Sequence, residues 1–300
     1  MMRTKISMAT LTLALFASPA VAADLPALKE PPVLPPSAIW TGAYFGANLG
    51  GIFDASSSIK IVSAPLYNDA ANGAGLVGPS AFGNAVALAI PGESNASNLG
   101  VIGGGQIGYN WQFSSFLAGV ETDIQGTTLS QNVKVFGSAT ERTTGAFVGV
   151  QTNFSKSLGY LGTVRGRFGY LVTPTLLLYG TAGLAYGGAN FNNGVFVLSS
   201  LANFPTAAVS ENYNDGRIGW AAGGGVEWMF MPRWSAKVEY LYYDLGTVSA
   251  NAIAWGVVGS GAMLYSDYFK SSARINGNVV RAGVNYHFQP LGPAPVLAKY

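Results

Sequence analysis

Hydrophobic and polar positions alternate with a period of two over residues 99–113 (LGVIGGGQIGYNWQF). Valine, isoleucine and aromatic side chains fall on one set of positions, and glycine, glutamine and asparagine occupy most of the other. Successive side chains of a β-strand point to opposite faces, whereas a helix would scatter Ile107, Tyr109 and Trp111 around its circumference. The pattern therefore predicts a strand with one apolar face and one small or polar face.

Seven further segments show the same alternation, and together they predict an all-β fold of eight antiparallel strands. These segments are residues 39–51, 116–126, 158–172, 176–188, 217–230, 234–246 and 278–288. Where such a segment contains charged residues, they lie opposite the aromatic ones, as Arg165 and Arg167 lie opposite Phe168. The two faces of residues 39–51 cannot be assigned in this way.

The connections between these strands alternate strictly between short and long. The short ones are Ser114–Ser115, the residues around Pro174, and 231–233; the long ones are 52–98, 132–157, 193–215 and 250–272. Outer-membrane β-barrels have short periplasmic turns, longer extracellular loops and an even number of strands. The sequence therefore predicts a transmembrane antiparallel up-and-down β-barrel with both ends in the periplasm.

The alternative is a soluble up-and-down barrel, which would bury apolar side chains inside and expose its charges. Here the charges share a face with small residues, opposite the aromatic face, which favours a lipid-facing exterior. From residue 39 onward no apolar stretch approaches the roughly 20 residues that a spanning helix needs. A closed barrel is the other structure that satisfies its backbone within a membrane.

The start of the chain has the features of a secretory signal peptide: basic Arg3 and Lys5, an apolar run at residues 6–17, and small residues at 20–22. An uncleaved anchor is disfavoured because this run is too short to span a bilayer. The predicted organisation is a signal peptide (1–22), a Pro-rich periplasmic linker (23–38), an outer-membrane β-barrel (39–288) and a C-terminal periplasmic extension (289–300).

Composition agrees with a membrane protein, since 49% of residues are hydrophobic and only 10% are charged, against about a quarter charged in ordinary soluble domains. Without Arg3 and Lys5, 14 basic residues remain against 14 acidic ones. A neutral mature chain has no electrostatic basis for binding nucleic acid. The absence of cysteine excludes disulfides and thiolate metal sites.

The inward faces of the predicted strands carry four acidic and four basic residues. They are Glu121, Asp123, Arg165, Arg167, Glu227, Lys237, Glu239 and Arg281. An eight-stranded barrel is only wide enough for side chains to fill it, and an unpaired buried charge is costly. We therefore expect an ion-pair network that plugs the lumen; the alternative is a polar path for small solutes, as in a diffusion porin.

Aromatic residues near the predicted strand ends are expected to form girdles at the membrane interface. They are Trp40, Tyr109, Trp111, Tyr170, Trp228, Trp234 and Tyr242. His287, the single histidine, is expected at the periplasmic rim. Stacking against carbohydrate is a less favoured use of the aromatic rings.

Catalytic and cofactor chemistry is not expected. Gly103, Gly105 and Gly108 have the G-x-G-x-x-G spacing of a dinucleotide-binding turn, but that turn requires a helix after the glycines. A single histidine cannot build a multi-histidine metal site. Acid pairs such as Glu121 with Asp123 could serve as catalytic groups, but the nearby arginines favour structural pairing, so we predict no enzyme activity, metal or cofactor.

The order of several short motifs resembles that of the small outer-membrane β-barrel surface proteins of alphaproteobacteria, the porin-family or outer-membrane β-barrel domain proteins. The motifs are WTGAYFGANLGG, GGGQIGYNWQF, VRGRFGY and VVRAGVNYHF, and they cover nearly the whole mature chain. The resemblance implies an OmpA-type eight-stranded barrel that acts as a surface antigen rather than an enzyme. It also implies that Phe288 matches the final aromatic residue of the assembly signal, although residues 289–300 follow it.

We therefore expect a plugged barrel that contributes to envelope structure and surface interaction. Its expected partners are outer-membrane lipid, lipopolysaccharide and the barrel-assembly machinery. The long connections at 52–98 and 250–272 are too apolar for plain solvated coil. They would extend the hairpins above the membrane, add a strand pair to make a ten-stranded barrel, or present an adhesive apolar patch; the sequence does not choose among these.

Overall fold

The computed structural model describes residues 39–66, 68–69, 76–77, 81–90, 92–95, 98–200, 207–257 and 263–288. All of them belong to one compact unit, Pro36–Tyr300. The predicted signal peptide, linker and C-terminal extension lie outside the described residues.

The described residues form strands and one short helix. In chain order they are β1 (Gly42–Asp54), β2 (Ser58–Pro65), β3 (Asn68–Asp69), β4 (Leu76–Val77), α1 (Ala81–Ala89), β5 (Glu93–Asn95), β6 (Leu99–Phe113), β7 (Phe116–Thr127), β8 (Ser130–Thr140), β9 (Phe147–Thr173), β10 (Leu176–Ser199), β11 (Ala207–Met231), β12 (Trp234–Val257) and β13 (Met263–Phe288). Within the described residues, no helix has the length and apolarity needed to cross a membrane.

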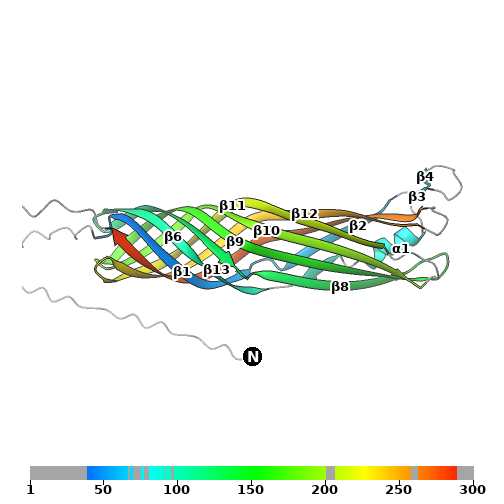
Figure 1. Cartoon of the computed structure of the whole chain (residues 1–300), viewed down its shortest axis with the longest axis horizontal. Helices are drawn as coiled ribbons and strands as arrows, with labels where there is room; N and C mark the ends of the chain where they lie inside the picture. The colour runs from blue at the N-terminus through cyan, green and yellow to red at the C-terminus, as the bar shows by residue number, and fades with distance from the viewer. Residues whose placement is uncertain are drawn as a thin grey trace, which may run out of the picture. The chain divides into compact units, whose positions relative to one another are not determined.

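Eight strands close into a ring, which confirms the predicted antiparallel up-and-down barrel (Figure 1). Their order around the ring is β1, β6, β7, β9, β10, β11, β12 and β13. Pairing of β1 with β13, in which Ala43 lies opposite Phe288, completes the closure. The ring therefore contains eight strands rather than ten. Seven of them include a whole predicted segment, and β1 overlaps the predicted segment 39–51 but begins at Gly42.

Tight turns join the strands at one end of the ring. Ser114 and Arg233 have positive φ values of 56° and 70° in the β6–β7 and β11–β12 turns. The N-terminal end of β1 and the C-terminal end of β13 lie at the same end (Figure 1). Because short turns and chain ends are periplasmic in outer-membrane barrels, we call this the periplasmic end.

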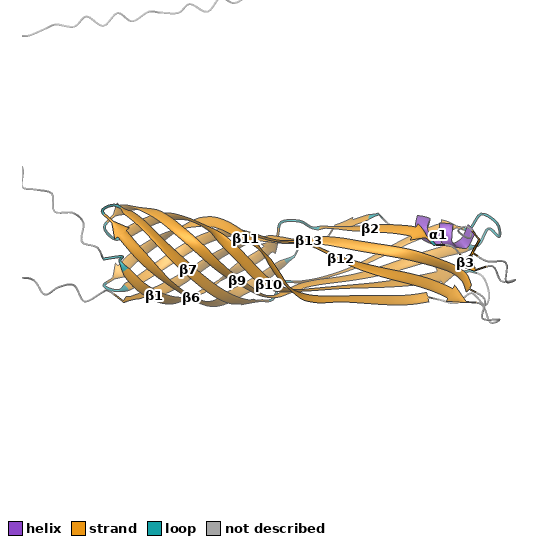
Figure 2. Cartoon of the chain, turned by 90° about the horizontal axis from the view of Figure 1, so that it is seen from above, coloured by secondary structure: helices purple, strands orange, loops and turns teal. Residues whose placement is uncertain are grey.

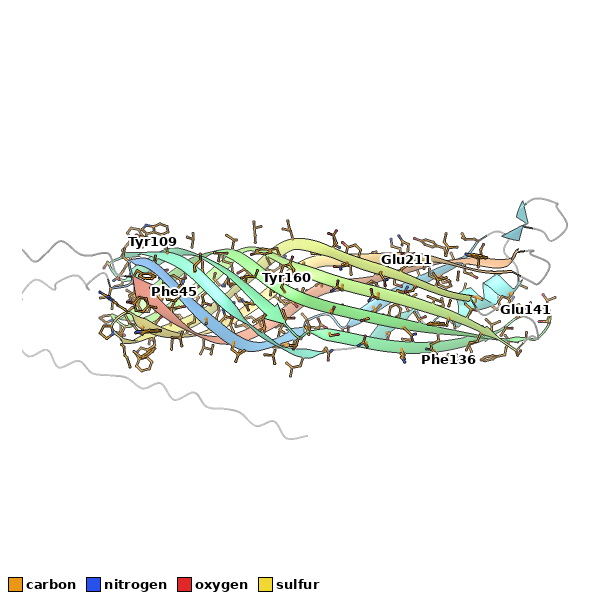
Figure 3. The ribbon with its side chains drawn as sticks, in the orientation of Figure 1. Phe45, Tyr109, Phe136, Glu141, Tyr160 and Glu211 are labelled. Atoms are coloured by element: carbon orange, nitrogen blue, oxygen red, sulfur yellow. The ribbon has the colours of Figure 1, made fainter. Side chains whose placement is uncertain are left out.

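Apolar side chains cover the outer surface of the ring and form an apolar band. Leu49, Ile107, Phe168 and Val238 are each at least 59% exposed. The labelled residues in Figure 3 place Phe45 and Tyr109 near the periplasmic end of this band, with Tyr160 towards its other edge. Such a surface is stable against lipid, where it meets acyl chains rather than water.

Beyond Tyr160, five of the ring strands continue into a second section, which we call the extension (Figure 2). It consists of β2, β5, β8, α1 and residues 147–158, 189–199, 207–217, 246–257 and 263–275. The long connections are therefore largely strands that extend the hairpins, which is the first of the three possibilities left open by the sequence.

The extension is built as two sheets that face each other. One contains β8, β9, β10 and β11; the other contains β12, β13, β2 and β5. The described pairing of β11 with β12 ends at Trp220 and Asp244. Next to this point β12 has a register shift between Asp244 and Thr247, and Gly246 has a φ of +82°, so β12 leaves β11 there and follows β13.

Outward-facing side chains are mainly apolar in the ring and mainly polar in the extension, and inward-facing side chains show the reverse. On β13, Val280 faces outward and Arg281 inward within the ring, whereas in the extension Lys270 faces outward and Phe269 inward. On β9 a register shift at the pairing of Gly188 and Ala189 leaves Gly159 unpaired. The ring thus has the pattern of a membrane barrel and the extension that of a water-soluble sandwich.

Apolar side chains fill the space between the two sheets. One cluster lies next to the ring and contains Phe154, Leu158 and Phe191 from the first sheet with Leu245 and Ile275 from the second. The second cluster lies further from the ring. It includes Phe82, Ala85, Val86 and Ala89 on the buried face of α1, so the helix fills the interior between β2 and β8, both of which it contacts.

Candidate functional site

All eight charged residues that the sequence assigned to the lumen lie inside the ring, and none is more than 4% exposed. They come from β7, β9, β11, β12 and β13. The register places opposite charges on neighbouring strands, with Glu121 beside Arg165, Glu227 beside Lys237, and Glu239 beside Arg281. The period-two alternation and the antiparallel register together account for this arrangement.

Arg165 is the centre of the part of the network nearer the extension. Its Nη2 lies 2.6 Å from Glu121 Oε1 and 2.9 Å from Asp123 Oδ2, and its Nη1 lies 3.0 Å from Glu239 Oε1. Arg281 Nη2 contacts the same three acids, at 2.7 Å from Asp123 Oδ2, 2.5 Å from Glu239 Oε2 and 3.7 Å from Glu121 Oε1. Two guanidinium groups therefore share three carboxylates.

Arg167 and Lys237 complete the network towards the periplasmic end. Arg167 Nη2 lies 2.6 Å from Glu227 Oε2, and Lys237 Nζ donates to both carboxylate oxygens of Glu121 at 2.9 and 3.0 Å. The Arg167 guanidinium also lies 4.1 Å from the ring centre of Tyr179. Cation–π contacts of this kind are strongest where water is excluded.

Neutral side chains bind several of the remaining polar atoms. Tyr44 accepts a hydrogen bond from Arg167 and donates one to Glu121. Asn285 and Ser235 both donate to Glu227 Oε1. Asp123 Oδ1, Arg167 Nε and Arg281 Nη1 have no hydrogen-bond partner among the described residues, so the network is nearly but not completely saturated.

His287 is buried inside the ring, not exposed at its rim. It is 2% exposed, its Nε2 lies 2.8 Å from Ser235 Oγ, and its ring packs edge-on against Trp40 with centres 5.5 Å apart. His287 lies one pair from the periplasmic end of β13, where a rim position was expected. Its side chain is buried because odd-numbered residues of β13 face inward, and it continues the inward series of Arg281 and Asn285.

Trp40 also differs from its predicted position. It is fully buried rather than exposed in a girdle, and its indole N–H donates to the carbonyl of Pro174 at 2.9 Å. It belongs to an apolar cluster with Leu117, Leu171, Leu177, Tyr179 and Met229. This cluster, which we call the periplasmic cap, lies at the periplasmic end of the ring.

The other predicted girdle residues lie on the outer surface. Tyr109, Trp111, Tyr170, Trp228 and Trp234 are between 36% and 54% exposed, and all five lie near the periplasmic end of their strands. Tyr242 is partly buried near the other edge of the apolar band. Phe288 ends β13, is 52% exposed and packs against Phe45 and Tyr286.

The residues that sequence reasoning missed lie mainly on β1. Tyr44 contacts Arg167 and Glu121, and Asn48 donates to Gln106, which in turn donates to Asn285. The faces of β1 could not be assigned because most of its positions carry small or aromatic residues. Pairing with β6 and β13 is what identifies Tyr44 and Asn48 as inward-facing.

The glycines of the G-x-G-x-x-G spacing lie within β6, where Gly103 and Gly105 pair with β1 and β7. The strand continues to Phe113, so no helix follows them and the phosphate-binding turn is absent from this segment. Among the described residues, no group of three or more histidine, cysteine or acidic side chains is arranged to hold a metal ion.

The interior therefore has three successive layers: the periplasmic cap, the charged network and the apolar core of the extension. The network balances four acidic residues with four basic ones. Removing one member of a buried pair leaves an uncompensated charge, which costs about 3–5 kcal/mol. The arrangement links the strands of the ring through ion pairs between their inward side chains.

Comparisons with known proteins agree with this architecture. The outer membrane protein beta-barrel domain family matches residues 8–288. The 31 kDa outer-membrane immunogenic protein of Brucella melitensis is 30% identical over 281 residues, covering 92% of this chain and 96% of that protein. The 22 kDa outer membrane protein of Rhizobium leguminosarum is 32% identical over 145 residues, which are 47% of this chain and 52% of that protein.

Solved barrels are more distant. The outer membrane protein OprG from Pseudomonas aeruginosa is 12% identical with a TM-score of 0.36, and the match covers 83% of this chain and 97% of that one. A likeness at this level adds no weight to the assignment.

Proposed function

Because the chain belongs to the outer membrane protein beta-barrel domain family, and is thus an outer-membrane protein of a Gram-negative cell, we propose that it is a closed, non-conducting surface barrel. Its role is to contribute to envelope structure and to hold a folded extension outside the membrane. Outer-membrane lipid and lipopolysaccharide surround the apolar band in this proposal, and the barrel-assembly machinery recognises the strand that ends at Phe288.

The observation that carries the proposal is the charge balance inside the ring. Arg165 and Arg281 each contact at least two carboxylates, and the eight charged side chains are almost completely buried. A conducting pore needs side chains that water can reach, and these face one another instead. The periplasmic cap and the apolar core of the extension lie on either side and strengthen the barrier.

The same contacts argue against catalysis in the barrel interior. A catalytic acid or base has to reach a proton on a substrate, but Glu121 is bound by Arg165, Lys237 and Tyr44. His287, the single histidine, lies between Ser235 and Trp40. We therefore propose that these groups are structural.

Single-channel recording of the refolded protein in a planar lipid bilayer tests the proposal. We expect no steady conductance from the wild-type chain under conditions in which a general diffusion porin conducts. Steady conductance that changes in Arg165→Ala or Glu239→Ala would contradict the closed barrel and identify a small-solute porin. Val238→Ala, which alters an outward neighbour of Glu239, is the matched control, and circular dichroism verifies that each variant is folded.

A further inference from the structure

Large apolar side chains are exposed again at the end of the extension furthest from the ring. They are Phe136, Phe147, Phe196, Leu198, Ile253 and Trp255, and each is between 42% and 55% exposed. We call these six residues the distal belt. In Figure 3, Phe136 lies at the opposite end of the strands from Phe45 and Tyr109.

The distal belt is separate from the apolar band of the ring. On β9 and β10 the outward positions between them are uncharged and mostly polar, and they include Asn153, Ser155, Asn190 and Asn192. We call these four residues the polar collar. A strand advances about 3.3 Å per residue, so Phe196 and Leu198, which follow Ala189 on β10, lie roughly 23–30 Å beyond the band.

The belt lies on both sheets of the extension. Phe136 and Phe196 flank Gln151 on the outer face of the first sheet, because both are its partners in the register. Ile253 and Trp255 lie on the outer face of β12, in the second sheet. A protein with a flat binding surface would cover only one of the two sheets. If the distal end of the extension inserts into a lipid surface, that surface contacts both sheets.

Uncompensated positive charges accompany the belt on both sheets. Lys134 lies two positions from Phe136 on the same face of β8. Lys270 of β13 lies opposite Asn251, two positions from Ile253 on the same face of the second sheet. Lys134, Lys270 and Arg142 have no ion-pair partner among the described residues. Glu93 is also exposed but lies opposite Lys60 in the register, so the belt favours a negatively charged surface.

Aromatic residues combined with lysine or arginine are typical of protein segments that lie in the headgroup region of an anionic bilayer.

We propose that the distal belt binds a second, anionic lipid surface opposite the membrane that holds the ring. The aromatic side chains enter its headgroup region, and Lys134, Lys270 and Arg142 contact its phosphate and carboxylate groups. This inference rests on the proposed function, in which the closed ring holds the extension outside the cell.

Vesicle capture tests the inference. The protein is reconstituted into nanodiscs of zwitterionic phosphatidylcholine, and protein-free vesicles of phosphatidylcholine with or without phosphatidylserine are added. We expect capture of the phosphatidylserine vesicles. Phe136→Ser and Trp255→Ser, on opposite sheets, should each weaken capture roughly tenfold, because each removes a large apolar side chain from the lipid contact. Asn153→Ser in the polar collar is the matched control and should capture like wild type.

Charge variants separate the electrostatic contribution. The double variant Lys134→Gln with Lys270→Gln should lower the capture of phosphatidylserine vesicles about tenfold or more, since each basic residue near an anionic surface contributes about 1 kcal/mol to binding. Capture of pure phosphatidylcholine vesicles should not change. Equal capture by the wild type and both serine variants would overturn the inference. Capture only of vesicles that themselves carry the protein would also overturn it, in favour of pairing between two copies.

Tryptophan quenching gives a second measurement that does not depend on affinity. The other five tryptophans, at positions 40, 111, 220, 228 and 234, lie in the ring, so brominated lipid placed only in the added vesicles should quench Trp255 alone. Trp255→Phe should remove this quenching while capture persists. If the protein does not conduct, and neither captures vesicles nor shows quenching, this inference is overturned and the proposed function stands. If it conducts and also captures vesicles, only the proposed function is overturned.

Discussion

Lys156 Nζ lies 3.1 Å from Asp54 Oδ1 inside the extension, with the two side chains 6% and 1% exposed. Lys156 projects from β9 and Asp54 ends β1, while Lys156 also lies 3.4 Å from the carbonyl oxygen of Arg274 on β13. One ammonium group therefore joins the first sheet of the extension to the top of the ring and to the second sheet. Among the described residues, Lys156 is the one buried lysine of the extension, and the side chains around it are largely apolar.

Lys156→Met should destabilise the protein by about 3–5 kcal/mol, because it leaves the carboxylate of Asp54 buried without a counter-charge. The double variant Lys156→Met with Asp54→Leu should recover most of that loss, since an apolar pair can replace a buried ion pair. Urea unfolding in detergent micelles measures both values. Lys134→Met, on the exposed face of β8, should change the unfolding free energy by less than about 0.5 kcal/mol. A double variant as unstable as Lys156→Met would contradict this account.

The sequence predicted the ring well because lipid and lumen impose opposite demands on alternate residues. Arg165, Arg167 and Glu239 could be assigned to the lumen from their immediate neighbours, without knowledge of register. The pairing of particular acids with particular bases depends on the relative register of strands that are distant in sequence, such as β7 and β13. No local sequence pattern encodes that register. For this reason the set of eight charges was foreseen, but the sharing of Asp123 by Arg165 and Arg281 was not.

The sequence offered the extension as one of three possibilities but could not select it, because its polarity is reversed. The rule that puts charges inside the ring would put Lys270 inside the extension and Phe269 outside, and the structure has the opposite. Alternation alone does not show where lipid ends and water begins. The buried position of Trp40 was missed for a similar reason, since a tryptophan at a strand end fits a girdle and a cap equally well until the fold is known.

Arg165→Gln should lower the unfolding free energy by about 3–5 kcal/mol, because Glu121, Asp123 and Glu239 would then share too few positive charges. Adding Asp123→Asn restores the balance of charge and should recover part of the loss. Urea unfolding followed by tryptophan fluorescence measures the difference. Val164→Ala, on the lipid-facing side of the same strand, is the control. If Arg165→Gln unfolds like that control, the network is not what stabilises the ring.

Gly246→Ala should destabilise the extension by about 1–2 kcal/mol, because Gly246 has a φ of +82° and a side chain is strained in that conformation. The residue lies where β12 separates from β11, so the effect should appear as faster amide hydrogen exchange in residues 246–257. Gly216→Ala is the matched control, because a Cβ there would meet no atom within 4 Å and its φ is not in the left-handed region. Equal exchange in the two variants would argue against strain at Gly246.

Asp267 should make stability depend on pH. Its side chain is fully buried in β13, neither carboxylate oxygen has a hydrogen-bond partner among the described residues, and burial raises the pKa of Asp267 to about 8. The pKa of an aspartate in the unfolded chain is about 3.9. Between pH 4 and pH 8 the carboxyl group of Asp267 is protonated in the folded protein but ionised in the unfolded chain. Its contribution to the unfolding free energy is therefore most favourable below pH 4 and is lost as the pH rises through 8.

Asp267→Asn should remove this dependence, because an amide of the same shape does not ionise. The wild-type unfolding free energy should fall relative to that of the variant by about 1.4 kcal/mol per pH unit across the window, which urea unfolding at a series of pH values measures. Asp215→Asn, at an exposed aspartate on β11, should keep the wild-type slope because it leaves Asp267 unchanged. The same slope in wild type and Asp267→Asn would mean that Asp267 is ionised in the folded protein and has found a partner or water.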